Sequence, residues 1–359
     1  MGRVILLVQF GDVGDMVLTI PAIRSIRHRY PAAHLLLLAK ENPGRLVTRL
    51  GLVDELLATD KHAFDRLSSL LRPAGIARAS NLLRTLRRRG IDTAVVFHHL
   101  VTRWGSLKFA VLTLSTGAAH RVGVDNGRGW FLTQAVPDRG FGDRHESEYW
   151  MDVAALLDAR SDLRLDFPLT SEDRAAASVL LTPAGRDLPV IAIHPGTGWY
   201  GPGRRWPAER FAQAASLISE HRRATFVVVG TDEDRSEARV VLDRLPSAVD
   251  LVGRTTLPQL GAVLQRCDLL LANDGGVAHV AAAVGTRVVA VFGPSNDRAW
   301  RPTGARVVAV DLPCRPCFYR DFERGKPAGC GTRECLTAVS PRMVADTALE
   351  VLGGQPVVA

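Results

Sequence analysis

The chain has 359 residues, a length that exceeds one typical hydrophobic core and suits two α/β domains. Apolar residues make up 47% and charged residues 23%, as in an ordinary globular protein, and no segment reaches the roughly eighteen uninterrupted apolar residues of a membrane span. The formal net charge of +8 indicates an anionic partner, for which nucleic acid, a nucleotide-sugar and an anionic membrane surface all qualify. Scarce aromatic residues and the lack of a basic recognition helix argue against nucleic acid.

Strand-like runs alternate with amphipathic helical runs along the chain, which is typical of parallel sheets built from β-α-β units. The pattern predicts a helix over about 15–29 and strands near 4–8, 35–38, 55–57, 93–97, 190–193, 225–229, 268–271, 288–292 and 307–310. These strands predict two sheets of similar size. We expect the active site in the cleft between the domains, outside the carboxyl ends of the strands.

A turn-rich stretch suggests where the domains divide. We assign residues 1–175 to an N-terminal domain, 176–188 to a linker, 189–345 to a second domain and 346–359 to the end of the last helix and a tail. The apolar N-terminal run leads into Gly11-Asp12 without a small-residue cleavage site. It therefore predicts the first strand of a cytoplasmic enzyme rather than a signal peptide.

The first strand leads into a turn that contains glycine and an acidic residue. Gly11 and Gly14 have the spacing G-x-x-G, and no G-K-[ST] follows, so neither the Rossmann fingerprint nor the P-loop is present. Asp15 lies at the start of the next helix, where its carboxylate could take a proton from an acceptor hydroxyl. A helix cap is the more common role of such an aspartate.

The second domain opens with a strand that runs into a loop rich in glycine and proline. The loop begins at His194-Pro195-Gly196-Thr197 and ends at Arg204-Arg205-Trp206-Pro207. Thr197, a guanidinium from Arg204 and backbone donors would suit a diphosphate. Trp206 is expected to be a packing residue.

The segment from Asn273 to Ala283 joins a buried strand to a helix that opens with glycine. The amides after Gly275 and Gly276 are predicted to be free at the helix N-terminus, where they favour an anion. Asp274 and His279 add an acid and an imidazole to this junction. An ordinary turn capped by Asp274 is the alternative.

Four cysteines follow the pattern C-x2-C-x12-C-x4-C in a loop over residues 314–335: Cys314, Cys317, Cys330 and Cys335. The spacing favours a structural zinc or iron site, ahead of two free thiol pairs and then of disulfides. The basic residues Arg320, Arg324 and Lys326 in the same loop fit an acceptor-facing surface equally well. Cys267 is expected in the core.

Taken together and in this order, these regions resemble the ADP-heptose:lipopolysaccharide heptosyltransferases of glycosyltransferase family 9. The opening motif of that family is similar to Gly14-Asp15-x-x-x-Thr19-x-Pro21-Ala22. Its central motif is similar to His194-Pro195-Gly196 with Arg205-Trp206-Pro207, and its donor motif to residues 273–279 with Phe292-Gly293-Pro294. The resemblance covers most of the chain.

The resemblance implies the GT-B architecture, an α/β fold of two facing Rossmann-like domains with parallel sheets and a central cleft. It implies inverting transfer of a heptose or related sugar from an ADP-activated donor to an acceptor hydroxyl, without a catalytic metal. Asp15 would be the general base, and the helix N-terminus at Gly275 and Gly276 would stabilise the leaving diphosphate together with Arg204. The sequence departs from the family at Arg204, where a lysine is common, and at Gly275, where a hydroxyl residue is common.

Further residues complete the predicted site. Asp232 and Glu233 would bind the ribose or base, with surface loop acids as the alternative, and His98, His99 and Gly14 would lie on the acceptor side. The acceptor is expected to be a lipid-linked saccharide, a natural product or a protein, and the basic surface suggests peripheral contact with the inner face of the cytoplasmic membrane. The alternative functions are a GT-B nucleotide-sugar epimerase and a non-catalytic nucleotide-sugar binder; the oligomeric state is left open.

Overall fold

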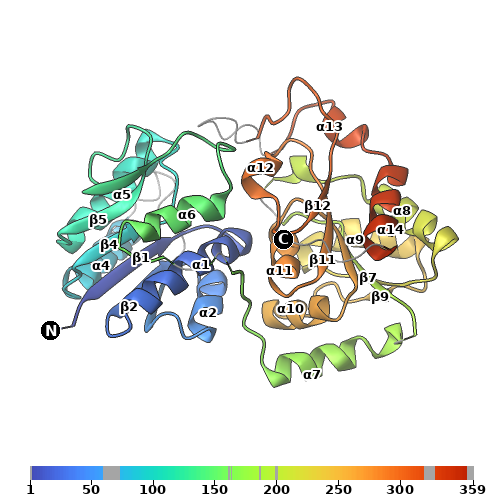
Figure 1. The fold of residues 1–359 in the computed structure, drawn as a ribbon, viewed down its shortest axis with the longest axis horizontal. Coiled ribbons are helices and arrows are strands. Elements are labelled where there is room, and N and C mark those ends of the chain that lie inside the picture. The colour runs from blue at the N-terminus through green and yellow to red at the C-terminus, as the bar shows by residue number, and fades with distance from the viewer. Residues whose placement is uncertain are drawn as a thin grey trace. The chain divides into compact units, whose positions relative to one another are not determined.

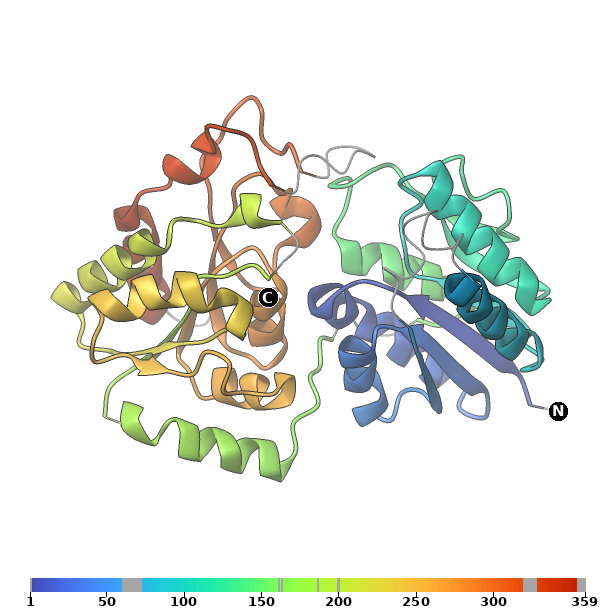
Figure 2. The same ribbon diagram turned by 180° about the vertical axis from the view of Figure 1, so that it is seen from behind.

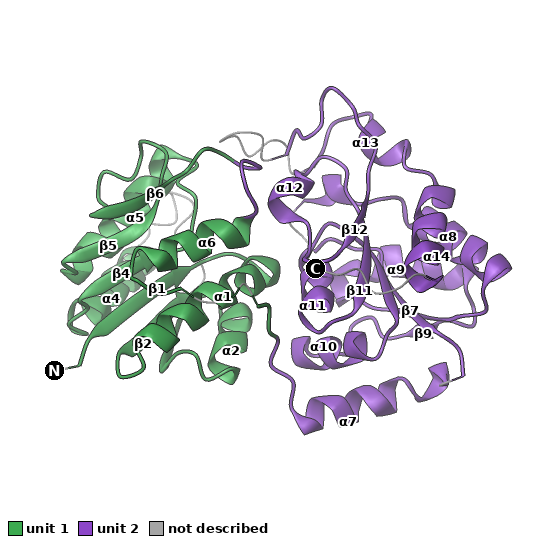
Figure 3. Cartoon of the chain, in the orientation of Figure 1, with its two compact units in different colours: residues 1–140, 146–166 green, residues 141–145, 167–359 purple. Residues whose placement is uncertain are grey.

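The structure, a computed structural model, describes residues 2–59, 73–160, 162, 164–185, 187–198, 201–318 and 328–353. The chain forms two compact units: residues 1–140 and 146–166 make unit 1, and residues 141–145 and 167–359 make unit 2 (Figure 3). The stretch 176–188, predicted to be a linker, belongs to unit 2. There α7 (Ser171–Leu180) packs against α10 (Leu257–Gln265).

Unit 1 contains a parallel sheet with the strand order β3-β2-β1-β4-β5-β6 (Figure 1). Its strands are β1 (Val4–Gln9), β2 (His34–Ala39), β3 (Glu55–Ala58), β4 (Thr93–Val96), β5 (His120–Asp125) and β6 (Gln134–Pro137). Its helices are α1 (Val13–Arg29), α2 (Glu41–Arg49), α4 (Pro73–Arg87), α5 (Arg103–Thr116) and α6 (Glu146–Ala155).

Both faces of this sheet are covered, which explains its continuous apolar strands. Ile5 and Leu7 of β1 pack with residues of α1 and α6 on one face (Figure 1), whereas Leu6 and Val8 pack with residues of α4 and α5 on the other (Figure 2). Each fully buried aliphatic side chain contributes roughly 1.5–3 kcal/mol. The period of two along β1 thus fixes the two helical layers.

Unit 2 repeats this plan with the order β12-β11-β10-β7-β8-β9. All of its strand pairs in the described residues are parallel. The strands are β7 (Val190–His194), β8 (Thr225–Val228), β9 (Val249–Asp250), β10 (Leu269–Asn273), β11 (Arg287–Val291) and β12 (Arg306–Val308). Besides α7 and α10, the helices are α8 (Ala208–His221), α9 (Arg235–Arg244), α11 (Gly276–Ala283), α12 (Asp297–Trp300), α13 (Glu334–Thr337) and α14 (Pro341–Gly353), with short 3-10 turns at Thr182–Ala184, Pro202–Arg204 and Asp232–Asp234.

The two sheets have the same topology. When the strands of unit 2 are counted from β7, both orders become 3-2-1-4-5-6, the order of dinucleotide-binding folds. The strand order reverses between β1 and β4 in unit 1 and between β7 and β10 in unit 2. In open α/β sheets, ligands bind outside the carboxyl ends of the strands at such a switch point.

The prediction of parallel α/β sheets is confirmed, although the pattern missed three strands. β9 has only two residues, and β5 and β6 begin with the exposed residues His120 and Gln134. Trp206 is fully buried and packs edge-on against Phe211 with ring centroids 4.8 Å apart, as expected of a packing residue. Within the described part of the chain, no helix combines the length and the apolar character needed to span a membrane.

Candidate active site

The turn from β1 to α1 lies at the switch point of unit 1. Gln9, the last residue of β1, accepts a hydrogen bond from the amide of Gly11 at 2.8 Å and donates one to the Thr19 hydroxyl at 2.8 Å. The Thr19 hydroxyl in turn donates to the carbonyl of Asp15 at 2.7 Å. Gln9 and Thr19 are both buried, so this chain of bonds fixes the backbone around Asp15.

Asp15 is half-buried in the first turn of α1, which begins at Val13, two residues before the predicted start. Its Oδ2 accepts a hydrogen bond from the amide of Asp12 at 2.8 Å, so the carboxylate does take part in capping the helix. Asp12 also pairs with Lys40. The capping role and the predicted role of base are compatible, because a carboxylate has lone pairs left for a second partner.

Gly11 allows this approach of Asp15. A Cβ atom at position 11 would lie 2.3 Å from the Cβ of Asp15 and 2.5 Å from its Oδ2. Gly14 is buried in the same turn. Glycine at position 11 is therefore required by close packing against the carboxylate.

The two histidines that were assigned to the acceptor side follow β4. His98 is half-buried, and its Nδ1 lies 2.8 Å from the carbonyl oxygen of His99. His99 is only 5% exposed, and its ring bridges two buried carboxylates, with Nδ1 2.9 Å from Asp138 and Nε2 3.1 Å from Glu146. Burial alone would lower the pKa of His99, but the charges and hydrogen bonds of Glu146 and Asp138 raise it to about 10. No sequence pattern indicates this pairing, because the two carboxylates are 39 and 47 residues away along the chain.

The turn from β10 to α11 lies at the switch point of unit 2. Asn273 ends β10 fully buried: its amide nitrogen donates to the carbonyl of Pro195 at 2.7 Å, and its Oδ1 accepts from the amide of Trp206 at 2.8 Å. It thereby ties both ends of the glycine- and proline-rich loop to the central strand. Gly275 precedes α11, and no side chain of the described residues caps this helix. The amide of Ala278 donates to the carbonyl of Gly275 at 3.1 Å, which leaves the first two amides of the helix without an intrahelical partner.

Three predicted donor residues come together at this turn. Arg204 donates to Oδ2 of the buried Asp274 at 3.2 Å, and its guanidinium carbon lies 5.6 Å from the ring centre of Phe318. His279 is buried on the first turns of α11. Burial lowers the pKa of His279 to about 4; Asp274 opposes this, whereas His145 and Arg204 add to it. The site therefore combines an arginine, a carboxylate and a neutral imidazole beside a helix N-terminus.

Thr197 lies on the loop after β7, half-buried, and its hydroxyl accepts a hydrogen bond from Arg205 at 3.1 Å. Arg205 also pairs with Glu237 and therefore holds the loop rather than joining Arg204. Gly196 lies against Asp234, since a Cβ there would be 1.9 Å from Oδ1 of that carboxylate. Of the three acids after β8, Asp234 is buried, whereas the predicted ribose ligands Asp232 and Glu233 are exposed.

Asp234 and His194 form a buried pair that the sequence did not suggest. His194 Nε2 lies 3.6 Å from Asp234 Oδ2, which also accepts from the amide and the hydroxyl of Thr231 at 3.0 Å each. Burial by itself would raise the pKa of Asp234, but His194 and Thr231 lower it well below its usual range. The pair joins the ends of β7 and β8 under the candidate site.

The predicted four-cysteine metal site is not found among the residues that the structure describes. No group of three or more cysteine, histidine or acidic side chains among them is placed to hold a metal. Cys314 and Cys317 are exposed, Cys335 is buried against Gly293, and the sulfur of Cys330 accepts from the amide of Arg333 at 3.3 Å. Burial, and then the neighbouring thiols, raise the pKa of Cys335, so the sulfurs are near one another without forming a ligand shell. The basic residues 320, 324 and 326 and the tail 354–359 lie outside the described residues; Cys267 is buried as expected.

Comparison with known proteins decides the family, because the profile described as "Glycosyltransferase family 9 (heptosyltransferase)" matches residues 80–327. The chain belongs to this family. Lipopolysaccharide heptosyltransferase 2 of Escherichia coli (strain K12) is 25% identical over 354 residues, which cover 92% of this chain and 93% of that protein. This glycosyltransferase therefore has relatives that match it over nearly its whole length.

Solved structures agree with the fold. The structure of E. coli ADP-heptose lps heptosyltransferase II matches with a TM-score of 0.72 at 21% identity and covers 98% of both chains. The family 9 glycosyltransferase from Veillonella parvula DSM 2008 matches with a TM-score of 0.75 at 22% identity and covers 98% of this chain and 97% of the other. The predicted GT-B fold class, with its two Rossmann-like parallel sheets, is confirmed.

Proposed function

We propose that this glycosyltransferase transfers a heptose or a related sugar from an ADP-activated donor to an acceptor hydroxyl, with inversion at the anomeric carbon. The donor is inferred from the name of the solved relative, an ADP-heptose heptosyltransferase, together with the chemistry of unit 2. Unit 1 would hold the acceptor and unit 2 the donor. These assignments follow the switch points, where each unit presents one of the groups that the reaction needs.

The reaction is a single displacement. The acceptor oxygen attacks the anomeric carbon, the bond from that carbon to the diphosphate oxygen breaks, and the acceptor proton passes to a base. We assign the base to Asp15, whose carboxylate is half-buried at the end of β1 and fixed through Gln9 and Thr19. The hydrogen bond from the Asp12 amide holds the carboxylate in one orientation.

The leaving diphosphate needs positive charge and donors that are already in place. We assign these to Arg204, Thr197 and the amides of Gly275 and Gly276 at the start of α11. His279 is neutral at pH 7 because the pKa is about 4, so it would act as a hydrogen-bonding group and not as a cation. Asp232 and Glu233, which follow β8, would bind the ribose hydroxyls.

The observation that carries the proposal is the ion pair between Arg204 and Asp274 beside the uncapped start of α11. The pair places a guanidinium at the end of β10, 17% exposed, next to backbone donors that no described side chain occupies. A planar guanidinium with several N–H groups suits a diphosphate bidentately.

A panel of ADP- and UDP-sugars tests the donor. ADP-heptose should raise the unfolding temperature of the full chain more than any UDP-sugar at equal concentration, because ligand binding to the native state stabilises it. Free ADP and free UDP are the controls, because they show how much of the stabilisation comes from the nucleotide without the sugar. Stabilisation by UDP-sugars alone would contradict the ADP assignment.

For the acceptor, we propose a lipid-linked saccharide of the lipopolysaccharide kind at the inner face of the cytoplasmic membrane. The name of the E. coli relative and the net charge of +8 support this. Sedimentation with vesicles that contain anionic lipid, compared with neutral vesicles, tests the membrane contact; equal binding to both would contradict it. The epimerase and the non-catalytic binder are not favoured by the family match.

A further inference from the structure

A short segment of the chain leaves unit 1 and belongs to unit 2. Residues 141–145 cluster with unit 2, although the residues before and after them belong to unit 1 (Figure 3). We call residues 141–145 the crossing segment. Its two stems are the end of β6 with Asp138, and the start of α6 at Glu146.

The crossing segment is attached to unit 2 at both of its ends. The amide of Asn296 donates to the carbonyl of Phe141 at 3.2 Å, and the Phe141 ring lies 5.0 Å from that of Trp300. His145 Nε2 lies 2.8 Å from the carbonyl oxygen of Arg301. Gly142 packs between these contacts, with a φ of 90°.

These contacts put the crossing segment beside the candidate donor site. Asn296 lies five residues after the end of β11, and β11 pairs with β10 so that Val291 is level with Asn273. His145 is also one of the groups whose charge lowers the pKa of the buried His279. The crossing segment therefore lies within electrostatic reach of the residues assigned to the diphosphate.

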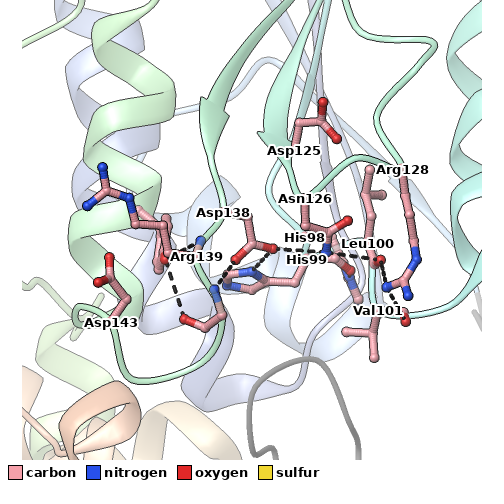
Figure 4. A network of polar contacts seen from close by, with 12 residues as sticks. His98, His99, Leu100, Val101, Asp125, Asn126, Arg128, Asp138, Arg139 and Asp143 are labelled. Carbon is pink, nitrogen blue, oxygen red and sulfur yellow. Dashed lines mark hydrogen bonds and ion pairs between the residues drawn. The ribbon is translucent and has the colours of Figure 1, made fainter.

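One buried histidine of unit 1 holds both stems. His99 contacts Asp138 on one stem at 2.9 Å and Glu146 on the other at 3.1 Å, and all three side chains are at most 6% exposed. Figure 4 shows His99 against Asp138, whose carboxylate also accepts from Asn126 at 3.3 Å and from the amide of Gly140 at 3.0 Å. A single imidazole thus closes the loop that carries the crossing segment.

We propose that the crossing segment is part of the nucleotide-sugar site of unit 2, with His145 as a binding residue for the donor diphosphate and His99 as the residue that positions the segment. The proposal rests on the donor function proposed above. The ligand class is a nucleoside diphosphate or its sugar ester, because the neighbouring Arg204 and the α11 amides select an anion. In this proposal His99 acts on the segment through Asp138 and Glu146.

Gly142→Ala tests the position of the crossing segment without touching the buried network. A Cβ at position 142 would lie 2.0 Å from the side-chain nitrogen of Asn296. This nitrogen donates to the carbonyl of Phe141, and Oδ1 of the same side chain caps α12. Gly285→Ala is the matched control: its φ is 86°, and no described atom lies within 4 Å of the new Cβ. Both variants carry the same backbone strain, and only the first displaces the segment.

The measurement is the affinity of the full chain for ADP by titration calorimetry. We expect Gly142→Ala and His145→Ala each to weaken ADP binding about tenfold, as for one lost hydrogen bond to a charged group. Gly285→Ala, and His221→Ala at the end of α8, should change it less than about twofold. Wild-type protein that does not bind ADP would overturn the donor function and this proposal with it; wild-type binding that Gly142→Ala leaves unchanged would overturn this proposal alone.

His99→Gln tests the positioning role. We expect it to weaken ADP binding and to speed hydrogen exchange over residues 141–145 while exchange in β7 and α8 stays as in the wild type. A purely structural role would lower the unfolding temperature and leave ADP affinity at low temperature unchanged, and that result would overturn the assignment to His99. If His99→Gln does not fold, Gly142→Ala still decides whether the segment contributes to the site.

Discussion

The two strand-to-helix turns at the switch points share the order of a buried strand, glycine and a helix, but they present different groups. In the turn after β1, the side chain of Asp15 caps the start of α1, because its carboxylate accepts a hydrogen bond from the amide of Asp12. This turn therefore presents a carboxylate. The turn after β10 leaves the helix start without a described side-chain cap and presents backbone amides beside Arg204. The same local fold thus presents a carboxylate in unit 1 and uncapped backbone amides in unit 2, which are the proposed base and the proposed diphosphate site.

The largest expected effect is on the carboxylate turn. Asp15→Asn should lower the transfer rate by about 10²- to 10⁴-fold, because it removes the base while keeping the shape. ADP affinity should stay nearly unchanged, since the donor residues are in unit 2. A rate assay with saturating donor and a calorimetric titration check both parts.

Asp12→Asn is the control for this change. It removes the neighbouring charge that pairs with Lys40, and asparagine is still a favourable N-cap residue for α1. A rate within a few-fold of the wild type is expected. If Asp15→Asn kept the full rate, the base would have to be another group; if it lost ADP binding and stability together, Asp15 would be only a cap.

The next effect is on the amide turn. Arg204→Gln should weaken ADP binding by about tenfold or more, because it removes a charged donor from the diphosphate. It should also destabilise unit 2, since Asp274 is 4% exposed and loses its ion pair. Arg306→Ala, an exposed pair with Glu350, is the control and should leave ADP affinity unchanged. Equal ADP affinity for Arg204→Gln and the wild type would contradict the assignment of Arg204.

A third test compares the glycines of the two turns. Gly11→Ala should destabilise the protein by about 1–3 kcal/mol and reduce transfer, because its Cβ would lie 2.3 Å from that of Asp15. Gly275→Ala should fold normally, since its φ of 176° is extended and the nearest described atom lies 4.0 Å from the new Cβ. The Gly275→Ala variant should therefore bind ADP more weakly while its unfolding temperature stays as in the wild type. A large loss of stability in Gly275→Ala would show that the space is needed by the fold itself.

The sequence predicted most of the fold and the local part of the site. Both turns were recognisable because a buried strand, glycine and a helix are contiguous in the chain. The edge strand β9 was missed because two residues carry no periodic pattern. The metal site was predicted from cysteine spacing, but spacing does not fix the directions of the four thiols, and the described side chains form no group that could hold a metal.

The buried partners of the site could not be predicted from the sequence. His99 meets carboxylates that are 39 and 47 residues away, and only the order of β4, β5 and β6 in the sheet brings them together. Among the three acids after β8, the sequence favoured Asp232 and Glu233, whereas the one next to His194 is Asp234. Which acid of a short run faces inward depends on the 3-10 turn at Asp232–Asp234, which no periodic pattern marks.

The smallest expected effect concerns one buried histidine from each unit, His99 and His279. His99 has its pKa raised from 6.5 to about 10, so the folded protein binds more protons than the unfolded chain between these values. The stability that His99 contributes is therefore complete below about pH 6.5 and lost as the pH rises toward 10. His279 has its pKa lowered from 6.5 to about 4, so its contribution is lost in the opposite direction, as the pH falls from 6.5 toward 4.

Denaturant unfolding at pH 5, 7 and 9 can separate the two, because all other titrating groups are shared by the variants and the wild type. His99→Gln should cost most stability relative to wild type at pH 5 and 7 and less at pH 9, because at pH 9 the imidazole is neutral in the unfolded chain and wild-type folding has to take up a proton. His279→Gln should cost more at pH 7 than at pH 5, because at acid pH the wild-type protein already has to keep that imidazole neutral. Parallel pH profiles for the two variants would mean that the surroundings of the two histidines do not differ, and the contrast between His99, held by two carboxylates, and His279, whose pKa is lowered mainly by burial, would fail with them.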